Sequence, residues 1–233
     1  MHLETSEMDG RRGAPSRRVA RALDPGPLAI QLVFFAQALA FASWLPRLPE
    51  LKAAFGLSEG EVGMLLMALP AGAIAAAPLT GLASTRLAPR ALVLAAMAWM
   101  LGAVALIGLA PGPVPLAAVL LLVGLGGGLM GVAMNAAGLA VEAAVGRPVL
   151  ARCHAMYSVG LASGALLAGA FVAAGASIAV HLGTVATATL AAVMFVARWF
   201  PGPVELTRLH GQFAAQVCSI MAWAWFSNSM GER

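Results

Sequence analysis

The sequence predicts an all-α membrane protein built from six transmembrane helices. Of the 233 residues, 61% are hydrophobic and only 10% are charged, against about 45–50% and about 25% in an ordinary soluble domain. The apolar residues form long charge-free stretches, and no stretch alternates between apolar and polar residues as a half-buried strand would. Because backbone polar groups in lipid must be satisfied within the protein, such a chain folds as a helical bundle rather than as a water-soluble globule.

The first four spans follow from length and from breaks in the chain. A helix needs about 20 apolar residues to cross the hydrocarbon layer, and residues 28–46 and 62–82 each meet this requirement. Residues 91–141 carry no charge for 51 positions, which is too long for one helix. The proline-rich cluster at 111–115 divides this stretch into a third and a fourth span, because a cluster of three prolines with a glycine cannot lie inside one helix.

The fifth and sixth spans share residues 155–197, where only His181 interrupts the apolar run, and the segment 173–177 is the expected turn between them. We expect long connections at 47–61, between the first two spans, and at 142–154, between the fourth and fifth. The same three-helix unit occurring twice, the second time inverted, would give this spacing, so the six helices are expected to form 3+3 inverted repeats.

The distribution of basic residues predicts the orientation. Cytoplasmic loops of membrane proteins carry an excess of Lys and Arg, and a cytoplasmic N-terminus puts 12 of the 14 basic residues inside, leaving Arg47 and Lys52 outside. We therefore expect a multi-pass protein of the bacterial inner membrane with both termini cytoplasmic. The net charge of +4 follows from this topology, so no nucleic-acid partner is needed. The alternative for the N-terminus is a signal peptide, since Arg17 and Arg18 precede an apolar run.

Several segments match a known family. They are residues 44–51 (WLPRLPEL), 57–63, 81–90, 124–135 and 146–160. With these pieces the chain resembles the N-terminal six-helix half of a bacterial major facilitator superfamily transporter of the fucose-permease-like and drug-efflux-like group. The resemblance covers residues 28–200. It implies half of that transporter fold and the transport of a small solute, with no enzymatic activity, no cofactor and no metal.

Two features depart from the family. Its signature between the second and third spans reads G-x-x-x-D-R-x-G-R followed by Lys or Arg; here Gly81, Arg86 and Arg90 fit, whereas Thr85 replaces the acidic residue. The family has twelve spans, whereas this chain has six. Residues 201–233 also change in composition, and we expect them to form an interfacial segment, with Trp223 and Trp225 at the headgroup level, or to result from truncation or a frameshift.

The expected organisation is therefore a basic cytoplasmic tail at 1–27, a six-helix bundle at 28–200 and an atypical C-terminal segment at 201–233. In the resembled fold the first, second, fourth and fifth helices line the central cavity. Polar residues on these helices are the candidates for contacting the substrate; they are Gln37, Asn135, Glu142, His154, Tyr157 and Ser158.

Each candidate also has a purely structural interpretation. Gln37 and Asn135 would serve equally well as hydrogen-bonding groups between helices. Glu142 could relay protons with His154, in a proton-coupled transporter, or pair with a nearby arginine. We interpret Arg47 and Glu50 as an interfacial surface pair.

Three further alternatives concern function. The chain could be an inactive or regulatory membrane fragment, since half of the cavity is missing. It could instead supply the missing half as a homodimer. A remote alternative is an intramembrane serine protease using Ser163 and His181, although Leu161 stands where the glycine two residues before the serine is expected.

Overall fold

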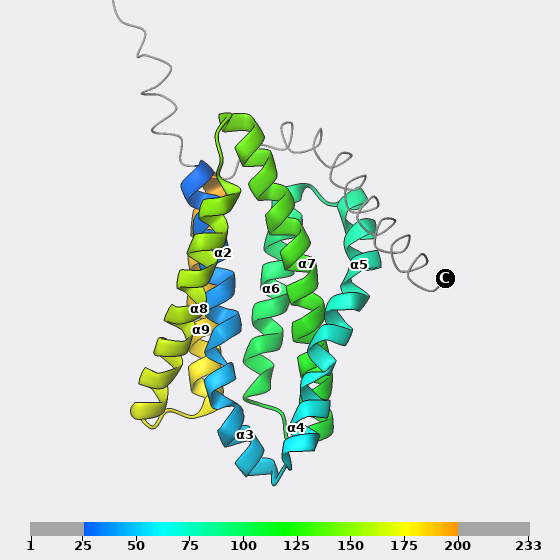
Figure 1. The fold of residues 1–233 in the computed structure, drawn as a ribbon, viewed down its shortest axis with the longest axis vertical. Helices are drawn as coiled ribbons and strands as arrows, with labels where there is room; N and C mark the ends of the chain where they lie inside the picture. Colours follow the sequence, from blue (N-terminus) through cyan, green and yellow to red (C-terminus); the bar gives the residue numbers. More distant parts are fainter. Residues whose placement is uncertain (1–25, 200–233) are drawn as a thin grey trace, which may run out of the picture.

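The computed structural model describes residues 26–199, and these residues form helices joined by short turns, with no strand among them (Figure 1). Within this described part of the chain, six helical segments are long and apolar enough to cross a membrane. The predicted fold class is therefore confirmed. The basic N-terminal tail up to residue 25 and the C-terminal segment with Trp223 and Trp225 lie outside the described residues.

The first three spans contain more helix than the sequence predicted. Their elements are α2 (Gly26–Ser43), a 3-10 turn (Leu45–Arg47), α3 (Leu48–Phe55), α4 (Glu59–Leu66), α5 (Ala68–Arg86) and α6 (Pro89–Ile107). The long connection expected at 47–61 is wrong, because α3 and the start of α4 fill it. Gly56 ends α3 with a φ of 63°, and Ser58 and Glu61 form a reciprocal capping box that begins α4.

The last three spans are α7 (Pro113–Val145), α8 (Leu150–Ala173) and α9 (Ile178–Val196), which ends in a 3-10 turn (Ala197–Trp199). The long connection expected at 142–154 is also wrong: only residues 146–149 separate α7 from α8, with Gly146 in the left-handed conformation at a φ of 65°. The breaks near 111–115 and at 173–177 are confirmed. Ser177 begins α9 by accepting a hydrogen bond from the backbone N–H of Val180.

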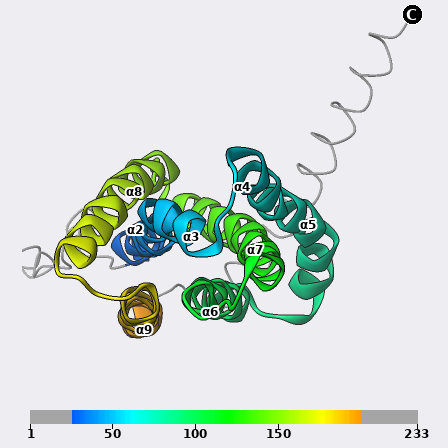
Figure 2. The same ribbon diagram turned by 90° about the horizontal axis from the view of Figure 1, so that it is seen from below.

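The packing of the helices relates two three-helix units, α2 to α6 and α7 to α9. The first helix of each unit packs between the second and third helices of the other: α2 lies against α8 and α9, and α7 lies against α5 and α6 (Figure 2). The third helices of the two units, α6 and α9, also pack together. This exchange of partners is the arrangement that inverted repeats produce around a pseudo-two-fold axis.

Glycines allow α8 to approach α2 closely, and they allow α7 to approach α5 in the same way. A Cβ added to Gly160 or Gly164 of α8 would lie 2.4 Å from the carbonyl oxygen of Phe35 or 2.3 Å from that of Leu39 on α2. In the corresponding pair, a Cβ on Gly124 of α7 would lie 2.1 Å from a backbone oxygen of α5. Gly124 and Gly128, like Gly160 and Gly164, are four positions apart and face the neighbouring helix, which is the GxxxG spacing that permits close helix packing in membranes.

Two helices remain largely uncovered. Only 22% of the most apolar window of the span containing α5, and 17% of that of α8, is buried, against 56% for the span that begins with α2. Both helices lie on the outer flanks of the row formed by α8, α2, α7 and α5 (Figure 2). Their exposed faces must contact lipid or another protein unit.

Candidate functional site

A cavity of about 320 Å³ lies between α2, α5, α7 and α8. These are the four helices that the family resemblance assigned to the cavity. Apolar side chains and α7 glycines form most of its lining, and its two polar side chains are Gln37 and Tyr157.

Gln37 is the central polar group of this cavity. It is only 4% exposed, and its Nε2 contacts the sulfur of Met100 at 3.6 Å. Its Oε1 is buried and has no hydrogen-bond partner among the described residues. A carbonyl oxygen in this state costs about 1–3 kcal/mol, so a donor from water or from a solute in the cavity would stabilise it.

Glycines of α7 create the space in the cavity. Gly124 and Gly128 turn toward α5, where a Cβ would collide with its backbone. Gly127 lines the cavity, and a Cβ at this position would meet no atom within 4 Å. A larger side chain at Gly127 would therefore fill the cavity without disturbing the helix packing.

The remaining candidates on α7 do not line this cavity. Asn135 is partly buried, and its Nδ2 donates to the carbonyl oxygen of Gly131, one turn earlier in the same helix, at 2.7 Å. Glu142 accepts hydrogen bonds through Oε2 from the backbone N–H groups of Val149 (2.8 Å) and Leu150 (2.9 Å). Its carboxylate thus caps the N-terminus of α8, where a negative charge is favourable. No ion pair joins it to an arginine within residues 26–199.

On α8, His154 and Ser158 lie near Tyr157 in sequence but are exposed and not part of the cavity lining. The His154 ring packs edge-on against Phe34, with 5.4 Å between centroids, and Ser158 donates to the backbone oxygen of His154 at 3.2 Å. The structure therefore brings together only Gln37 and Tyr157 of the six candidates.

The three residues that fit the family signature between the second and third spans lie at the junction of α5 and α6. Gly81 and Arg86 belong to the last turns of α5, and Arg90 to the first turn of α6. All three are exposed, and neither arginine forms an ion pair within the described part of the chain.

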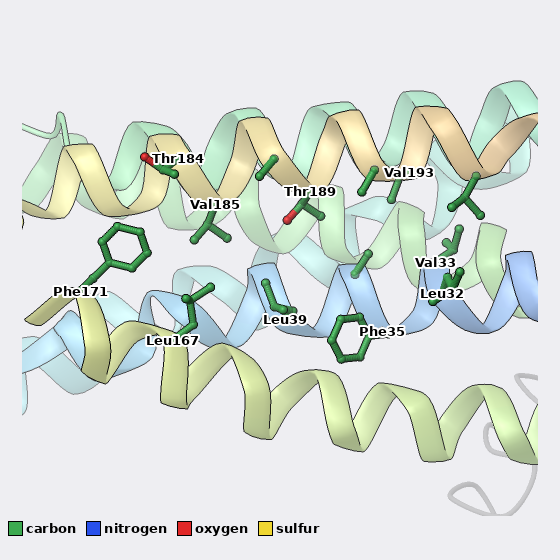
Figure 3. Close-up of a pocket in the computed structure, with 14 residues that line it drawn as sticks. Leu32, Val33, Phe35, Leu39, Leu167, Phe171, Thr184, Val185, Thr189 and Val193 are labelled. Atoms are coloured by element: carbon green, nitrogen blue, oxygen red, sulfur yellow. The ribbon is translucent and has the colours of Figure 1, made fainter.

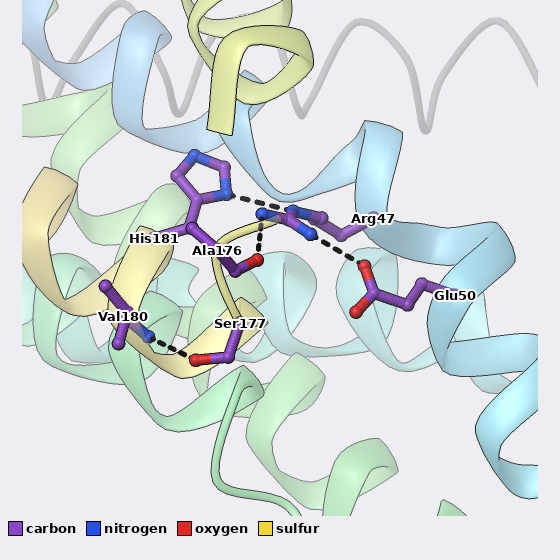
Figure 4. Close-up of polar contacts among 6 residues, drawn as sticks. All are labelled: Arg47, Glu50, Ala176, Ser177, Val180 and His181. Carbon is purple, nitrogen blue, oxygen red and sulfur yellow. Dashed lines mark hydrogen bonds and ion pairs between the residues drawn. The ribbon is translucent and has the colours of Figure 1, made fainter. Parts of the chain in front are cut away.

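Sequence reasoning missed a buried polar cluster at the other end of the bundle. Arg47 is only 2% exposed, so its interpretation as a surface residue is wrong. Its guanidinium donates to Glu50 Oε2 at 2.7 Å, to the carbonyl oxygen of Ala176 at 2.8 Å and to His181 Nδ1 at 3.3 Å (Figure 4). The signal in the sequence was weak, because two of the three partners of Arg47, Ala176 and His181, lie 129 and 134 positions away.

Comparison with known proteins decides the family. The model of the Major Facilitator Superfamily matches residues 30–230. The chain belongs to the major facilitator superfamily. The match continues through the segment at 201–230, whose composition had set it apart. This membership places the chain in a family of transporters rather than of enzymes.

Three curated relatives are similar to the chain. An uncharacterized MFS-type transporter of Yersinia pestis is 35% identical over 143 residues, 60% of this chain and 37% of the relative. An uncharacterized transporter of Sinorhizobium fredii is 36% identical over 141 residues, again 60% and 37%. The membrane protein MosC of Rhizobium meliloti is 28% identical over 174 residues, 74% and 41%. The matches thus span about two fifths of each relative's length. No solved structure matches this superfamily member.

Proposed function

We propose that this chain forms the N-terminal six-helix unit of a secondary transporter that moves a small solute across the bacterial inner membrane. Superfamily membership supports transport, and the motifs around residues 44–51 and 81–90 favour the fucose-permease-like and efflux-like group. The observation that carries the proposal is a cavity between four membrane-spanning helices that is lined by Gln37, whose buried Oε1 has no hydrogen-bond partner among residues 26–199.

In this proposal Gln37 and Tyr157 contact the solute. They come from different helices, α2 and α8, and bring a carbonyl oxygen and a hydroxyl to one cavity whose other lining is apolar or glycine. Such a site suits a solute with one hydrogen-bonding edge and an apolar body. Asn135, His154 and Ser158 lie toward the ends of α7 and α8 that meet at residues 146–149, where they would contact a solute on its way in or out. Glu142 holds the start of α8 in place rather than carrying protons.

We further propose that both termini and the α7–α8 connection are cytoplasmic. The support is the charge distribution, with 12 of the 14 basic residues on that side. The basic segment up to residue 27 would then be a cytoplasmic tail, and residues 28–200 the transmembrane unit.

A second six-helix unit would complete the cavity. Alternating access in this family is one half rocking against the other around a site at the midplane. The α5 and α8 helices are the two outer members of the cavity-lining row. Their exposed faces are available for such a unit, whether it is a homologous half or a second copy.

Ligand binding tests the proposal. Purified full-length protein would be screened by thermal shift against monosaccharides and against cationic dyes, which represent the two substrate classes of the resembled group. We expect at least one compound to raise the Tm of the wild type but not that of Gly127→Leu, which fills the cavity. Gly131→Leu is the matched control, since it is also on α7, also has an open Cβ direction and lies outside the lining. Absence of any stabilising compound would favour the inactive-fragment alternative.

A further inference from the structure

A second hollow lies on the side of the bundle. It is a groove of about 470 Å³ between α2, α8 and α9, lined almost completely by apolar side chains, among them Phe35, Leu167, Phe171 and Val196 (Figure 3). Its base is α2, which packs against both neighbours. The α9 helix forms one wall along the whole groove, and α8 contributes Leu167 and Phe171 to the other wall, near the α8–α9 turn. Neither the solute cavity nor the Arg47 cluster includes it.

The groove has one closed and one open end. At the turn between α8 and α9, the Phe171 ring stacks on His181 with 4.4 Å between centroids, and the short connection keeps the two helices together. From there α8 and α9 diverge toward the level of Leu32, so the groove widens on the side where α2 begins and α9 ends (Figure 3).

The chemistry of the lining selects an apolar occupant. No charged residue within 26–199 lines the groove, and the hydroxyls in its lining come from Thr184 and Thr189. The hydroxyl of Thr184 donates to the carbonyl oxygen of Val180 at 2.7 Å and is thus satisfied within its own helix. Since the groove lies between spans of a membrane protein, the material that covers it is either lipid or another helix.

The length of the groove distinguishes between lipid and another helix as its occupant. The α9 wall runs from Thr184 to Val196, which corresponds to about 18 Å at about 1.5 Å per residue. The hydrocarbon layer is about 30 Å thick, so the groove spans roughly one leaflet. A transmembrane helix would need a groove across both leaflets, whereas an acyl chain needs only one.

We propose that this groove binds one acyl chain of a phospholipid from the leaflet on its open side. The chain enters between the diverging ends of α8 and α9, and its methyl end lies against Phe171. A lipid held there joins two helices that otherwise meet mainly through α2.

Photo-crosslinking tests this proposal on the full-length protein. The protein is reconstituted in vesicles of phosphatidylethanolamine and phosphatidylglycerol that contain a phosphatidylcholine with a diazirine on one acyl chain. After irradiation, adducts are mapped by mass spectrometry. We expect several-fold more adducts at Phe35 and Leu167 than at Leu166 and Met194, which are strongly exposed but do not line the groove.

Two neighbouring alanines of α9 provide a matched pair of variants. Both are exposed, but only Ala192 lines the groove. Ala192→Phe should lower the adducts at Phe35 and Leu167 several-fold, and Ala191→Phe should leave them unchanged. Equal labelling of all exposed faces, or equal effects of the two variants, would overturn the proposal. So would a disulfide-linked dimer formed through Ala188→Cys in a background without the native cysteines, because a second copy would then occupy the groove.

Discussion

Arg47 Nε donates a hydrogen bond to His181 Nδ1 at 3.3 Å, joining the end of the first span to the start of the last. Because Nδ1 accepts this bond, His181 is neutral and carries its hydrogen on Nε2. That nitrogen is buried and has no partner among the described residues. The same guanidinium also holds the α8–α9 turn through Ala176, so one side chain connects three segments on the side of the bundle opposite the α7–α8 connection.

Removing this guanidinium should destabilise the protein. Arg47→Ala leaves His181 and the carbonyl of Ala176 without their donor, and hydrogen bonds to charged groups contribute about 1.5–3 kcal/mol. We expect a lower Tm in detergent, corresponding to about 2–3 kcal/mol, and a smaller loss for Arg47→Lys, which keeps the charge but cannot reach all three partners. Lys52→Ala is the control, since the exposed Lys52–Glu59 pair is worth under about 1 kcal/mol. Equal Tm values for Arg47→Ala and Lys52→Ala would contradict the buried cluster.

Glu142 should act as a helix cap. Glu142→Gln keeps an oxygen that accepts from Val149 and Leu150, whereas Glu142→Ala removes it, and loss of a cap costs about 1 kcal/mol. We expect the Ala variant to lower the Tm clearly more than the Gln variant. If both variants keep the wild-type Tm, the capping role is wrong, and a role in proton transfer becomes the better explanation.

The crossing of α2 and α8 should depend on Gly164. In Gly164→Ala the new methyl group would lie 2.3 Å from the carbonyl oxygen of Leu39, so the helices must separate. We expect a strong loss of stability and of folded yield on size-exclusion chromatography. Gly169→Ala on the same helix meets no atom within 4 Å, and its better helix propensity should leave stability unchanged or raise it by up to about 1 kcal/mol. A folded, stable Gly164→Ala protein would show that α2 and α8 lie farther apart at this crossing than in the structure.

Cysteine labelling should report the proposed topology. In a background with Cys153 and Cys218 replaced by alanine, Gly112→Cys and Glu59→Cys should react with a membrane-impermeant thiol reagent added outside intact cells. Arg147→Cys should react only after the membrane is permeabilised. Labelling of Gly112→Cys exclusively from the cytoplasm would reverse the orientation.

The number and places of the spans could be predicted from the sequence because charge-free length and proline position decide them. The short helices α3 and α4 were missed although Pro49, Ser58 and Glu61 are typical helix-start residues, since a polar segment between two spans was taken for a loop. The connection between α7 and α8 was also expected to be longer than it is, because the left-handed Gly146 ends α7 only a few residues before α8 begins.

The candidate site was predicted only in part. Residue type and the family resemblance identified Gln37 and Tyr157, which share a cavity. They could not separate these two from Asn135, which bonds to its own helix, or from Glu142, whose partners are backbone N–H groups. The Arg47 cluster depends on contacts between residues far apart in sequence, which no local pattern reveals.

The exchange of partners between the two three-helix units has a consequence for biosynthesis. Leu39 of α2 packs against Gly164 of α8, which lies 125 positions later in the chain. At about 5–20 residues per second, it is synthesised roughly ten seconds later. During this interval the first helix is in the membrane without its closest neighbour, with Gln37 not yet buried. The insertion machinery or surrounding lipid must cover that face of the first helix until the fifth span is inserted. A slow step in translating residues 146–164 would therefore lengthen the period in which the nascent chain can be degraded.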